Sequence, residues 1–348
     1  MKSILLISNK VFHYRTKIYN TFFKLFKKHG CEFHVLSNEY QKVNFDIKFI
    51  KHEKSFGVLS YIHEINKIKP DVVIIFLHLR DRLIIPLTFY CKLKKIPIIY
   101  WSQGINIYTP DARIKNTIFR FIHSISDSIV LYTPDQLKYI SEKNKNKTFI
   151  AYNTLDFSDV DITHIRNKDE IKKIYHIKED KIVLYISRIL PYKKLDILLD
   201  VLKNTPVGLV IVGGGINQQQ MDIVKANDNY YYLGEKYGKD VDEIYNIGDI
   251  FSTPGHIGLA LNHSFFWGLP VIVLNVIHAP EIYYFKSGYN GFMVNSTEEL
   301  KYKILSLCEN EELLKSMSHN ARSTFKNMGI DKMFQGFIDA IEYVSSTQ

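Results

Sequence analysis

The chain has 348 residues, of which 46% are apolar and 14% aromatic; this composition excludes a disordered polypeptide and is enough for two domains of about 150–200 residues each. Three scattered cysteines, Cys31, Cys91 and Cys308, exclude a disulfide framework and a cysteine zinc site and fit a reducing compartment. Residues 1–165 hold 25 Lys and Arg against 14 Asp and Glu, so the basic excess behind the net charge of +9 lies entirely in this half.

The basic half of the chain indicates an anionic partner: a membrane surface, a substrate or a nucleic acid. No RNA- or DNA-binding signature occurs in the sequence, so we expect no nucleic-acid partner. The N-terminus lacks an apolar signal core, and the longest apolar run, residues 72–79, is far shorter than the ~20 residues of a membrane span. We therefore expect a cytoplasmic protein.

Short apolar runs alternate with helical stretches along the first half. Strands are predicted at residues 3–8, 32–36, 71–76, 96–101, 128–132 and 148–152. This alternation is typical of a parallel sheet covered by helices on both faces, so the expected fold class is α/β. Ligands of such sheets bind at the carboxyl ends of the strands. Gln103 and Gly104 follow one of these strands directly.

Two predicted helices of the first half combine an apolar stripe with basic residues. In residues 14–29, apolar side chains recur at helical spacing among four lysines, and Gly30 ends the pattern. In residues 113–125 a similar stripe lies beside Arg113, Lys115 and Arg120. Each helix either packs on the core with its cations in water or lies on anionic lipid headgroups.

The second half begins after a polar stretch at residues 158–165. A helix is predicted at 168–175 and a strand at 182–186, and the loop after this strand contains Arg188, Lys193 and Lys194. The next helix is predicted at 195–202. Cations in a loop at the carboxyl end of a strand are well placed to bind an anionic ligand.

The stretch of residues 249–295 has the pattern of a phosphate site. A short strand leads to a turn that contains Gly255, and a helix begins near Gly258 and ends at Gly268. Glycines allow a close backbone approach, and the free N–H groups and dipole of a helix start attract anions. We therefore predict that the amide groups of Gly258 and Leu259 bind phosphate; the alternative is an ordinary βαβ turn with a glycine-rich loop.

Two further motifs indicate other ligands. The run LVIVGGG at 209–215 is similar to a dinucleotide fingerprint, with Glu235 about twenty residues later, but Gln218 stands at the third glycine position. The alternative is a tight turn that ends a buried strand. Of two Asp-x-Asp triplets, one lies in the linker at 159–161 and the other, at 240–242, is interpreted as a helix start capped by Asp240, so we expect no metal.

The motifs PG-x-x-GL at 254–259, HS at 263–264, G-x-P at 268–270 and PE at 280–281 together resemble the donor-binding segment of bacterial family 4 glycosyltransferases of the capsule and exopolysaccharide type. Most members carry two glutamates, for the donor sugar and the ribose, where Gly255 and His263 stand here. The resemblance implies the GT-B fold, with two Rossmann-like parallel-sheet domains facing a central cleft. We expect an acceptor-binding domain at 1–160, a nucleotide-sugar-binding domain at 161–329 and a helix at 330–348 that returns to the first domain.

The resemblance also implies roles for individual residues. Arg188 and Lys193 would act on the donor diphosphate, and Glu281 would either contact the donor sugar or cap backbone N–H groups. The donor-binding set would be Gly214, Lys194, Gly255, His256, Gly258, Leu259, His263 and Ser264, with His263 in the ribose role. The acceptor or sugar side would consist of Tyr14, Arg15, Gln103 and Gly104. Gln103 replaces the histidine of many members and cannot act as a base.

The function implied by the resemblance is a retaining, metal-independent transfer of a sugar from a nucleotide-diphosphate sugar to a lipid-linked saccharide. The product would be a capsule, O-antigen or exopolysaccharide. No cofactor is expected, and the partners would be the nucleotide sugar, the acceptor and the anionic inner face of the cell membrane. A nucleotide-sugar epimerase of the same fold and a non-catalytic partner in a polysaccharide-assembly complex remain as alternatives.

Overall fold

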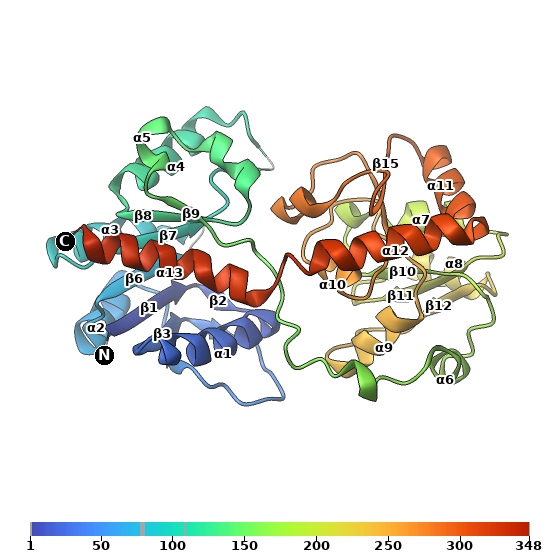
Figure 1. The fold of residues 1–348 in the computed structure, drawn as a ribbon, viewed down its shortest axis with the longest axis horizontal. Helices are drawn as coiled ribbons and strands as arrows, with labels where there is room; N and C mark the ends of the chain where they lie inside the picture. Colours follow the sequence, from blue (N-terminus) through green and yellow to red (C-terminus); the bar gives the residue numbers. More distant parts are fainter. Residues whose placement is uncertain (1, 77–80, 108, 348) are drawn as a thin grey trace. The chain divides into compact units, whose positions relative to one another are not determined.

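The computed structural model describes residues 2–76, 81–107 and 109–347, so the end of the apolar run 72–79 lies outside it. The chain divides into two compact units (Figure 1). Unit 1 comprises Met1–Asp156 together with Gly329–Gln348, and unit 2 comprises Phe157–Met328. The limits predicted from the sequence, residues 160 and 329, differ from these by four residues and one residue.

Unit 1 is built on a parallel sheet of seven strands in the order β5-β3-β1-β6-β7-β8-β9. The strands are β1 (Lys2–Ser8), β3 (Cys31–Ser37), β5 (Ile50–Glu53), β6 (Val72–Phe76), β7 (Ile98–Ser102), β8 (Ser128–Leu131) and β9 (Thr148–Ile150). In the register, Ile4 lies beside Phe33 on one side and beside Val72 on the other. A small parallel pair, β2 (Lys10–Val11) and β4 (Glu39–Tyr40), lies apart from this sheet.

Helices cover both faces of the unit 1 sheet, because successive residues of a buried strand point to opposite faces. Ile4 and Leu6 join the core cluster that includes α1 and α13, whereas Leu5 and Ile7 join the cluster of α2 and α3. The helices are α1 (His13–Lys28), α2 (Val58–Ile68), α3 (Ile84–Leu93), α4 (Arg113–Ile125), α5 (Glu142–Lys145), α13 (Ile330–Ser346) and the 3-10 helix η2 (Pro134–Tyr139).

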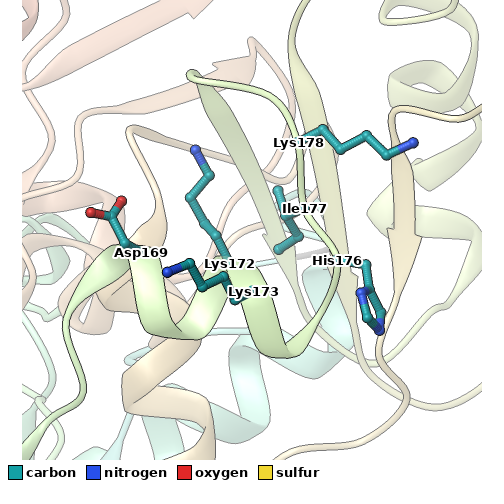
Figure 2. Close-up of a pocket in the computed structure, with 6 residues that line it drawn as sticks. All are labelled: Asp169, Lys172, Lys173, His176, Ile177 and Lys178. Carbon is teal, nitrogen blue, oxygen red and sulfur yellow. The ribbon is translucent and has the colours of Figure 1, made fainter.

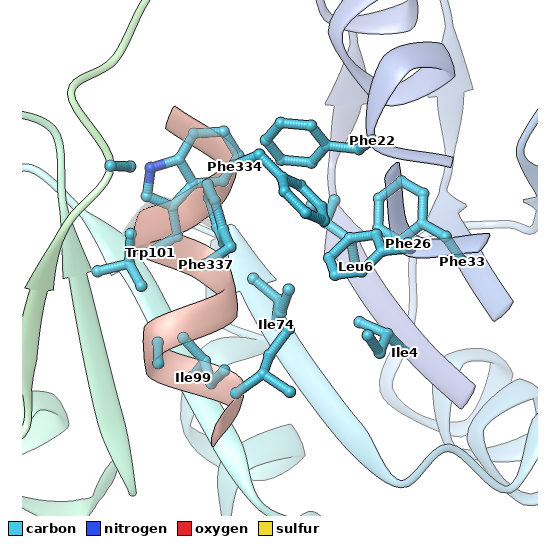
Figure 3. Packing of buried hydrophobic residues seen from close by; sticks show 14 of the residues in the cluster. Ile4, Leu6, Phe22, Phe26, Phe33, Ile74, Ile99, Trp101, Phe334 and Phe337 are labelled. Atoms are coloured by element: carbon cyan, nitrogen blue, oxygen red, sulfur yellow. The ribbon is translucent and has the colours of Figure 1, made fainter. Parts of the chain in front are cut away.

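The last helix, α13, is part of unit 1 (Figure 3). Its Phe334 lies 4.7 Å from Phe26 between ring centroids, and its Phe337 meets Trp101 edge-on at 4.9 Å. Edge-to-face aromatic pairs of this kind add to the stability gained by burial alone. Among the helices of the described residues, none has the length and apolar character that crossing a membrane requires.

Unit 2 is built on a parallel sheet of six strands in the order β12-β11-β10-β13-β14-β15. The strands are β10 (Ile182–Ile186), β11 (Gly208–Val212), β12 (Tyr230–Tyr232), β13 (Ile250–Ser252), β14 (Val271–Leu274) and β15 (Gly291–Val294). The helices are α6 (Lys168–Ile174), α7 (Leu195–Val201), α8 (Gln218–Lys225), α9 (Lys239–Ile247), α10 (Ala260–Phe266), α11 (Thr297–Glu309), α12 (Glu311–Phe325) and three 3-10 turns, η3 (Ile162–His164), η4 (Pro191–Lys193) and η5 (Pro280–Tyr284).

One predicted helix start in unit 2 is wrong. The cap of α9 is Gly238, and Asp240 already lies in the first helical turn. Glu243, in the same helix, accepts hydrogen bonds from Nε and Nη2 of Arg166. A buried carboxylate needs a partner of opposite charge, and Arg166 is far away in sequence, so the local pattern could not show it.

Candidate functional site

Arg188 lies in the loop between β10 and η4, and the glycine run after β11 holds this loop through backbone contacts. The amide of Ile189 donates to the carbonyl of Gly214 (2.8 Å). A Cβ atom at Gly213 would lie 1.9 Å from the carbonyl oxygen of Ser187, so only glycine fits there. The run LVIVGGG is therefore explained by close packing around the exposed Arg188, which favours the tight-turn interpretation over a dinucleotide fingerprint.

Arg188 and Glu281, two of the residues predicted to be catalytic, act electrostatically on the third, Lys193. Burial is the largest and the charge of Arg188 the second cause that lowers the pKa of Lys193; with the carboxylate of Glu281 acting in the opposite direction, the pKa falls from 10.5 to about 8. The Lys193 ammonium donates a hydrogen bond to the carbonyl of His256 (2.7 Å). An anion bound between Arg188 and Lys193 would relieve both the desolvation of the ammonium and the repulsion between the cations.

Gly255 brings the turn after β13 into direct contact with η4. A Cβ atom at Gly255 would lie 2.0 Å from the carbonyl oxygen of Tyr192. The amide of Gly255 donates to the backbone carbonyl of Lys193 (3.2 Å), and the amide of His256 donates to the backbone carbonyl of Tyr192 (3.1 Å). The close backbone approach expected of Gly255 is thus made to the chain's own backbone. This contact joins the turn that contains Lys193 to residues 255–259, the predicted phosphate loop.

Glu281 lies beside the start of α10. Its side chain is 3% exposed, and a Cβ atom at Gly258 would lie 3.8 Å from its carboxylate oxygen. The fold thus places this carboxylate beside the loop in which the expected glutamate pair is missing. Contact with the donor sugar and capping of backbone N–H groups both remain open for Glu281.

Two histidines connect the phosphate loop to the segment after β14. His256 has a ring nitrogen, Nδ1, 3.0 Å from the carbonyl oxygen of Ile277. His278, which was not predicted, accepts from the amide of Ile257 through Nδ1 (3.2 Å). Burial lowers the pKa of both rings, that of His278 to about 4. The sequence signal for His278 was its place two residues before the PE motif.

His263 and Ser264 are engaged elsewhere in unit 2. The Nε2 atom of His263 lies 2.8 Å from a carboxylate oxygen of Asp242 in α9, and its ring stacks on Tyr245 at 3.9 Å. The buried hydroxyl of Ser264 donates to the carbonyl of Ala260 (2.8 Å). The predicted contact between His263 and the ribose stays a prediction. In this structure Nε2 of His263 is paired with the carboxylate of Asp242.

The remaining predicted donor residues occupy turns and a helix start. Lys194 has a φ angle of 55°, the left-handed region that favours glycine, and is the cap of α7. Leu259 is the corresponding residue of α10. A Cβ atom at Gly214 would lie 2.7 Å from a carboxylate oxygen of Glu235, so that exposed carboxylate lies beside the Arg188 loop.

In unit 1 the predicted acceptor residue Arg15 is 3% exposed and belongs to the core. Its guanidinium lies 4.6 Å from the ring centroid of Trp101 and 5.5 Å from that of Tyr14, and it donates to the side chain of Asn153 (3.2 Å). Stacking on aromatic faces suits the weakly hydrated guanidinium. These contacts give Arg15 a structural role in the core, and its expected place on the acceptor side stays a prediction, as does that of the half-exposed Tyr14.

Gln103 and Gly104 form a tight turn after β7. Gly104 has a φ angle of 80°, and its amide donates to the hydroxyl of Ser102 (2.9 Å). The carbonyl of Gln103 accepts from the buried Gln136 side chain (2.9 Å), whose oxygen in turn accepts from the amide of Thr133 (3.0 Å). Gln136 was not predicted as a site residue, and its two hydrogen bonds hold this turn in place.

Two hollows of unit 2 contain no residue of the predicted site. One of about 480 Å³ is bounded by the side chains around the end of α6 (Figure 2): Asp169, Lys172, Lys173, His176, Ile177 and Lys178. The other, of about 420 Å³, lies between α12 and the turn after α10. A wide hollow lined by flexible lysines offers no fixed set of polar groups to a ligand. The loops that contain Arg188, Lys193 and Gly258 are therefore the better candidate for the ligand site.

Comparison with known proteins identifies unit 2. Residues 167–324 match the model of the family described as Glycosyl transferases group 1. The chain carries a group 1 glycosyltransferase domain. This match confirms the enzyme class expected from the sequence, a glycosyltransferase. The matched residues include Arg188, Lys193, Glu281 and the predicted phosphate loop.

Comparisons over the whole chain agree with this enzyme class. The chain is 26% identical over 337 residues to the uncharacterized glycosyltransferase MJ1178 of Methanocaldococcus jannaschii, covering 90% of each chain. Two solved structures superimpose over nearly the whole chain: Anabaena Alr3699/HepE in complex with UDP and glucose (TM-score 0.74, 14% identity, 98% and 100% covered) and sucrose-phosphate synthase of Thermosynechococcus elongatus (TM-score 0.77, 12% identity, 100% of both). These likenesses confirm the GT-B class, with two Rossmann-like domains.

Proposed function

We propose that the chain moves a sugar from a nucleotide-diphosphate sugar to a lipid-linked saccharide acceptor during surface polysaccharide synthesis, with retention of configuration and without a metal ion. The observation that carries this proposal is the cluster of Arg188, Lys193 and Glu281 beside the Gly258 loop. In support, the similarly folded Alr3699/HepE was crystallised in complex with UDP and glucose.

The charges of this cluster match the chemistry of the donor. When the bond between sugar and phosphate breaks, negative charge develops on the leaving diphosphate. Arg188, Lys193 and the amides that open α10 would stabilise that charge, and one well-placed donor contributes about 3–4 kcal/mol in comparable oxyanion sites. With retention, the acceptor hydroxyl approaches the face from which the diphosphate leaves, so its proton passes to a diphosphate oxygen as the new sugar–oxygen bond forms.

The experiment that tests the donor is a thermal-shift panel of UDP-, GDP-, dTDP- and CMP-sugars, with EDTA present and with NAD and NADP as controls. A ligand at about 100 times its Kd stabilises the folded chain by roughly 2.7 kcal/mol. Stabilisation by one of these nucleotide sugars would identify the nucleobase of the donor. Stabilisation by NAD alone would refute the proposal, and a flat panel would favour a non-catalytic role.

The membrane part of the proposal rests on α3 and α4. The apolar side chains of α1, among them Phe22 and Phe26, are buried in the core and therefore do not face lipid. On α3 and α4, in contrast, Leu93 and Ile114 are each 80% exposed, and the exposed rings of Phe89 and Phe121 lie 6.5 Å apart.

The charge around these apolar side chains suits anionic lipid. Residues 82–125 contain seven Lys and Arg and a single acidic residue, Asp111. Basic residues around exposed apolar side chains favour the headgroup region of an anionic bilayer. We expect salt-sensitive co-sedimentation with phosphatidylglycerol vesicles but not with phosphatidylcholine. Phe121→Ser should weaken it, whereas Leu59→Ser, on the exposed part of α2, should not; equal loss in both variants would remove α4 from the proposal.

A further inference from the structure

Two segments of the group 1 domain lie side by side: the loop between β13 and α10, and the stretch between β14 and η5. The amide of Leu274 donates to the carbonyl of Pro254 (3.0 Å), and the amide of Ala279 donates to that of Ile257 (2.9 Å). The first segment carries the predicted phosphate-binding amides, and the second leads to Glu281. Their relative position therefore decides the geometry of the candidate donor site.

His278 ties the second segment to the first through both ring nitrogens. Nδ1 accepts from the amide of Ile257 (3.2 Å), and Nε2 lies 2.9 Å from the carbonyl oxygen of Leu274, to which it can only donate. These two bonds require the neutral ring with its proton on Nε2. The ring is 8% exposed, and this burial, together with the nearby His256 and Lys193, keeps its pKa near 4.

His256 makes the reciprocal connection from the first segment to the second. Since the carbonyl of Ile277 can only accept, the ring of His256 donates to it through Nδ1–H (3.0 Å). The backbone carbonyl of the same residue accepts from the ammonium of Lys193 (2.7 Å). A change at His256 therefore reaches Lys193 directly.

We propose that His256 and His278 form a histidine clasp that positions the diphosphate-binding groups of the donor site. The clasp holds three groups in one arrangement: the amides that open α10, the Lys193 ammonium and the Glu281 carboxylate. Neither histidine need touch the donor, so both are positioning residues. This inference rests on the proposed function for the identity of the ligand, but the clasp itself is a property of the unliganded chain.

The variants follow from the geometry of the two hydrogen bonds. In His278→Asn the side-chain oxygen replaces Nδ1 as acceptor for the Ile257 amide. In His278→Phe the ring volume is kept and both bonds are lost. Similarly, His256→Asn keeps a donor for the Ile277 carbonyl and His256→Leu does not. His319→Phe, an exposed histidine of α12, is the matched control for replacing an imidazole by a phenyl ring.

Two measurements test the clasp. Hydrogen–deuterium exchange of residues 255–259 reports the loop in the unliganded chain, and calorimetric titration with UDP, GDP and dTDP reports diphosphate binding. We expect His278→Phe to exchange at least tenfold faster in this loop and to bind the diphosphate at least tenfold more weakly. His278→Asn and the control should stay within threefold of the parent chain in both measurements.

The outcomes separate the clasp from the proposed function. If the parent chain binds none of the three diphosphates, the donor proposal fails while hydrogen exchange still decides the clasp. Unchanged exchange and affinity in a folded His278→Phe would overturn the inference, as would equal losses in His278→Phe and His278→Asn. If His278→Phe does not fold, the comparison of His256→Leu with His256→Asn is decided by the same two criteria.

Discussion

Lys193 should make diphosphate affinity depend on pH. In the unliganded chain burial, with the charge of Arg188 as the second cause, holds the pKa of Lys193 at about 8 instead of 10.5. A diphosphate binds the ammonium more tightly than the neutral amine, so binding raises this pKa. By linkage, the affinity is nearly constant well below pH 8 and falls as the pH rises above 8.

The size of this effect follows from the two pKa values. One pKa unit corresponds to about 1.4 kcal/mol, so the Kd should rise about tenfold for each pH unit above 8 until the pKa of the complex is reached. Between pH 7 and pH 9 we therefore expect a Kd about tenfold higher. Lys193→Arg should remove the slope, because a guanidinium stays charged throughout this range.

The assay is calorimetric titration with the nucleoside diphosphate at pH 7, 8 and 9 and constant ionic strength. Lys178→Met, at an exposed lysine after α6, is the control and should keep the slope of the parent chain. A flat profile in the parent chain would show that Lys193 does not face the diphosphate. A slope that persists in Lys193→Arg would assign the titration to another group.

Four further changes test other parts of the structure. Arg188→Ala should lower kcat/KM by about 10²–10³ while the Tm stays unchanged, with Lys315→Ala as the control. Gly255→Ala should lower the free energy of unfolding by about 1–3 kcal/mol, since its Cβ would meet the Tyr192 carbonyl at 2.0 Å, whereas Gly329→Ala in open space should not. Phe334→Ala should cost about 3–5 kcal/mol in urea unfolding.

The fourth change concerns His123, whose ring nitrogens have no partner among the described residues. Burial holds its pKa at about 4, below the ordinary 6.5, so at pH 5 the unfolded chain binds a proton that the folded chain does not. The folded state therefore loses stability as the pH falls from 6.5 toward 4. His123→Phe should be more stable than the parent chain, with an additional advantage of about 2 kcal/mol at pH 5 over pH 7; an advantage independent of pH in calorimetric unfolding would contradict this.

The core strands were readable from local pattern, because a buried parallel strand is a short continuous apolar run. Residues 182–186 were placed from such a run and coincide with β10. The edge strand β5 was missed because its sequence, IKHE, is mostly exposed and lacks an apolar run. Its strand character comes from pairing with β3, which the local sequence does not encode.

In the candidate site, too, some residues could be predicted from the sequence and others could not. Arg188, Lys193 and the glycine turn could be named from sequence, because a loop at the end of a parallel strand has a known place in such folds. The partners of the buried polar side chains could not be named, since they are far away in sequence. Arg15 stacks on Trp101, His263 pairs with Asp242, and Glu281 lies beside Gly258.

By itself the sequence determined the α/β class, the two-domain organisation and the resemblance to a glycosyltransferase, since these depend on local periodicity and short motifs. Only the tertiary structure decided which polar residues face one another and which glycines are required by backbone contact. The physical reason is that hydrogen bonds and desolvation depend on groups brought together by folding. The histidine clasp illustrates this: His256 and His278 stand 22 residues apart, and their bonds exist only once β13 and β14 pair.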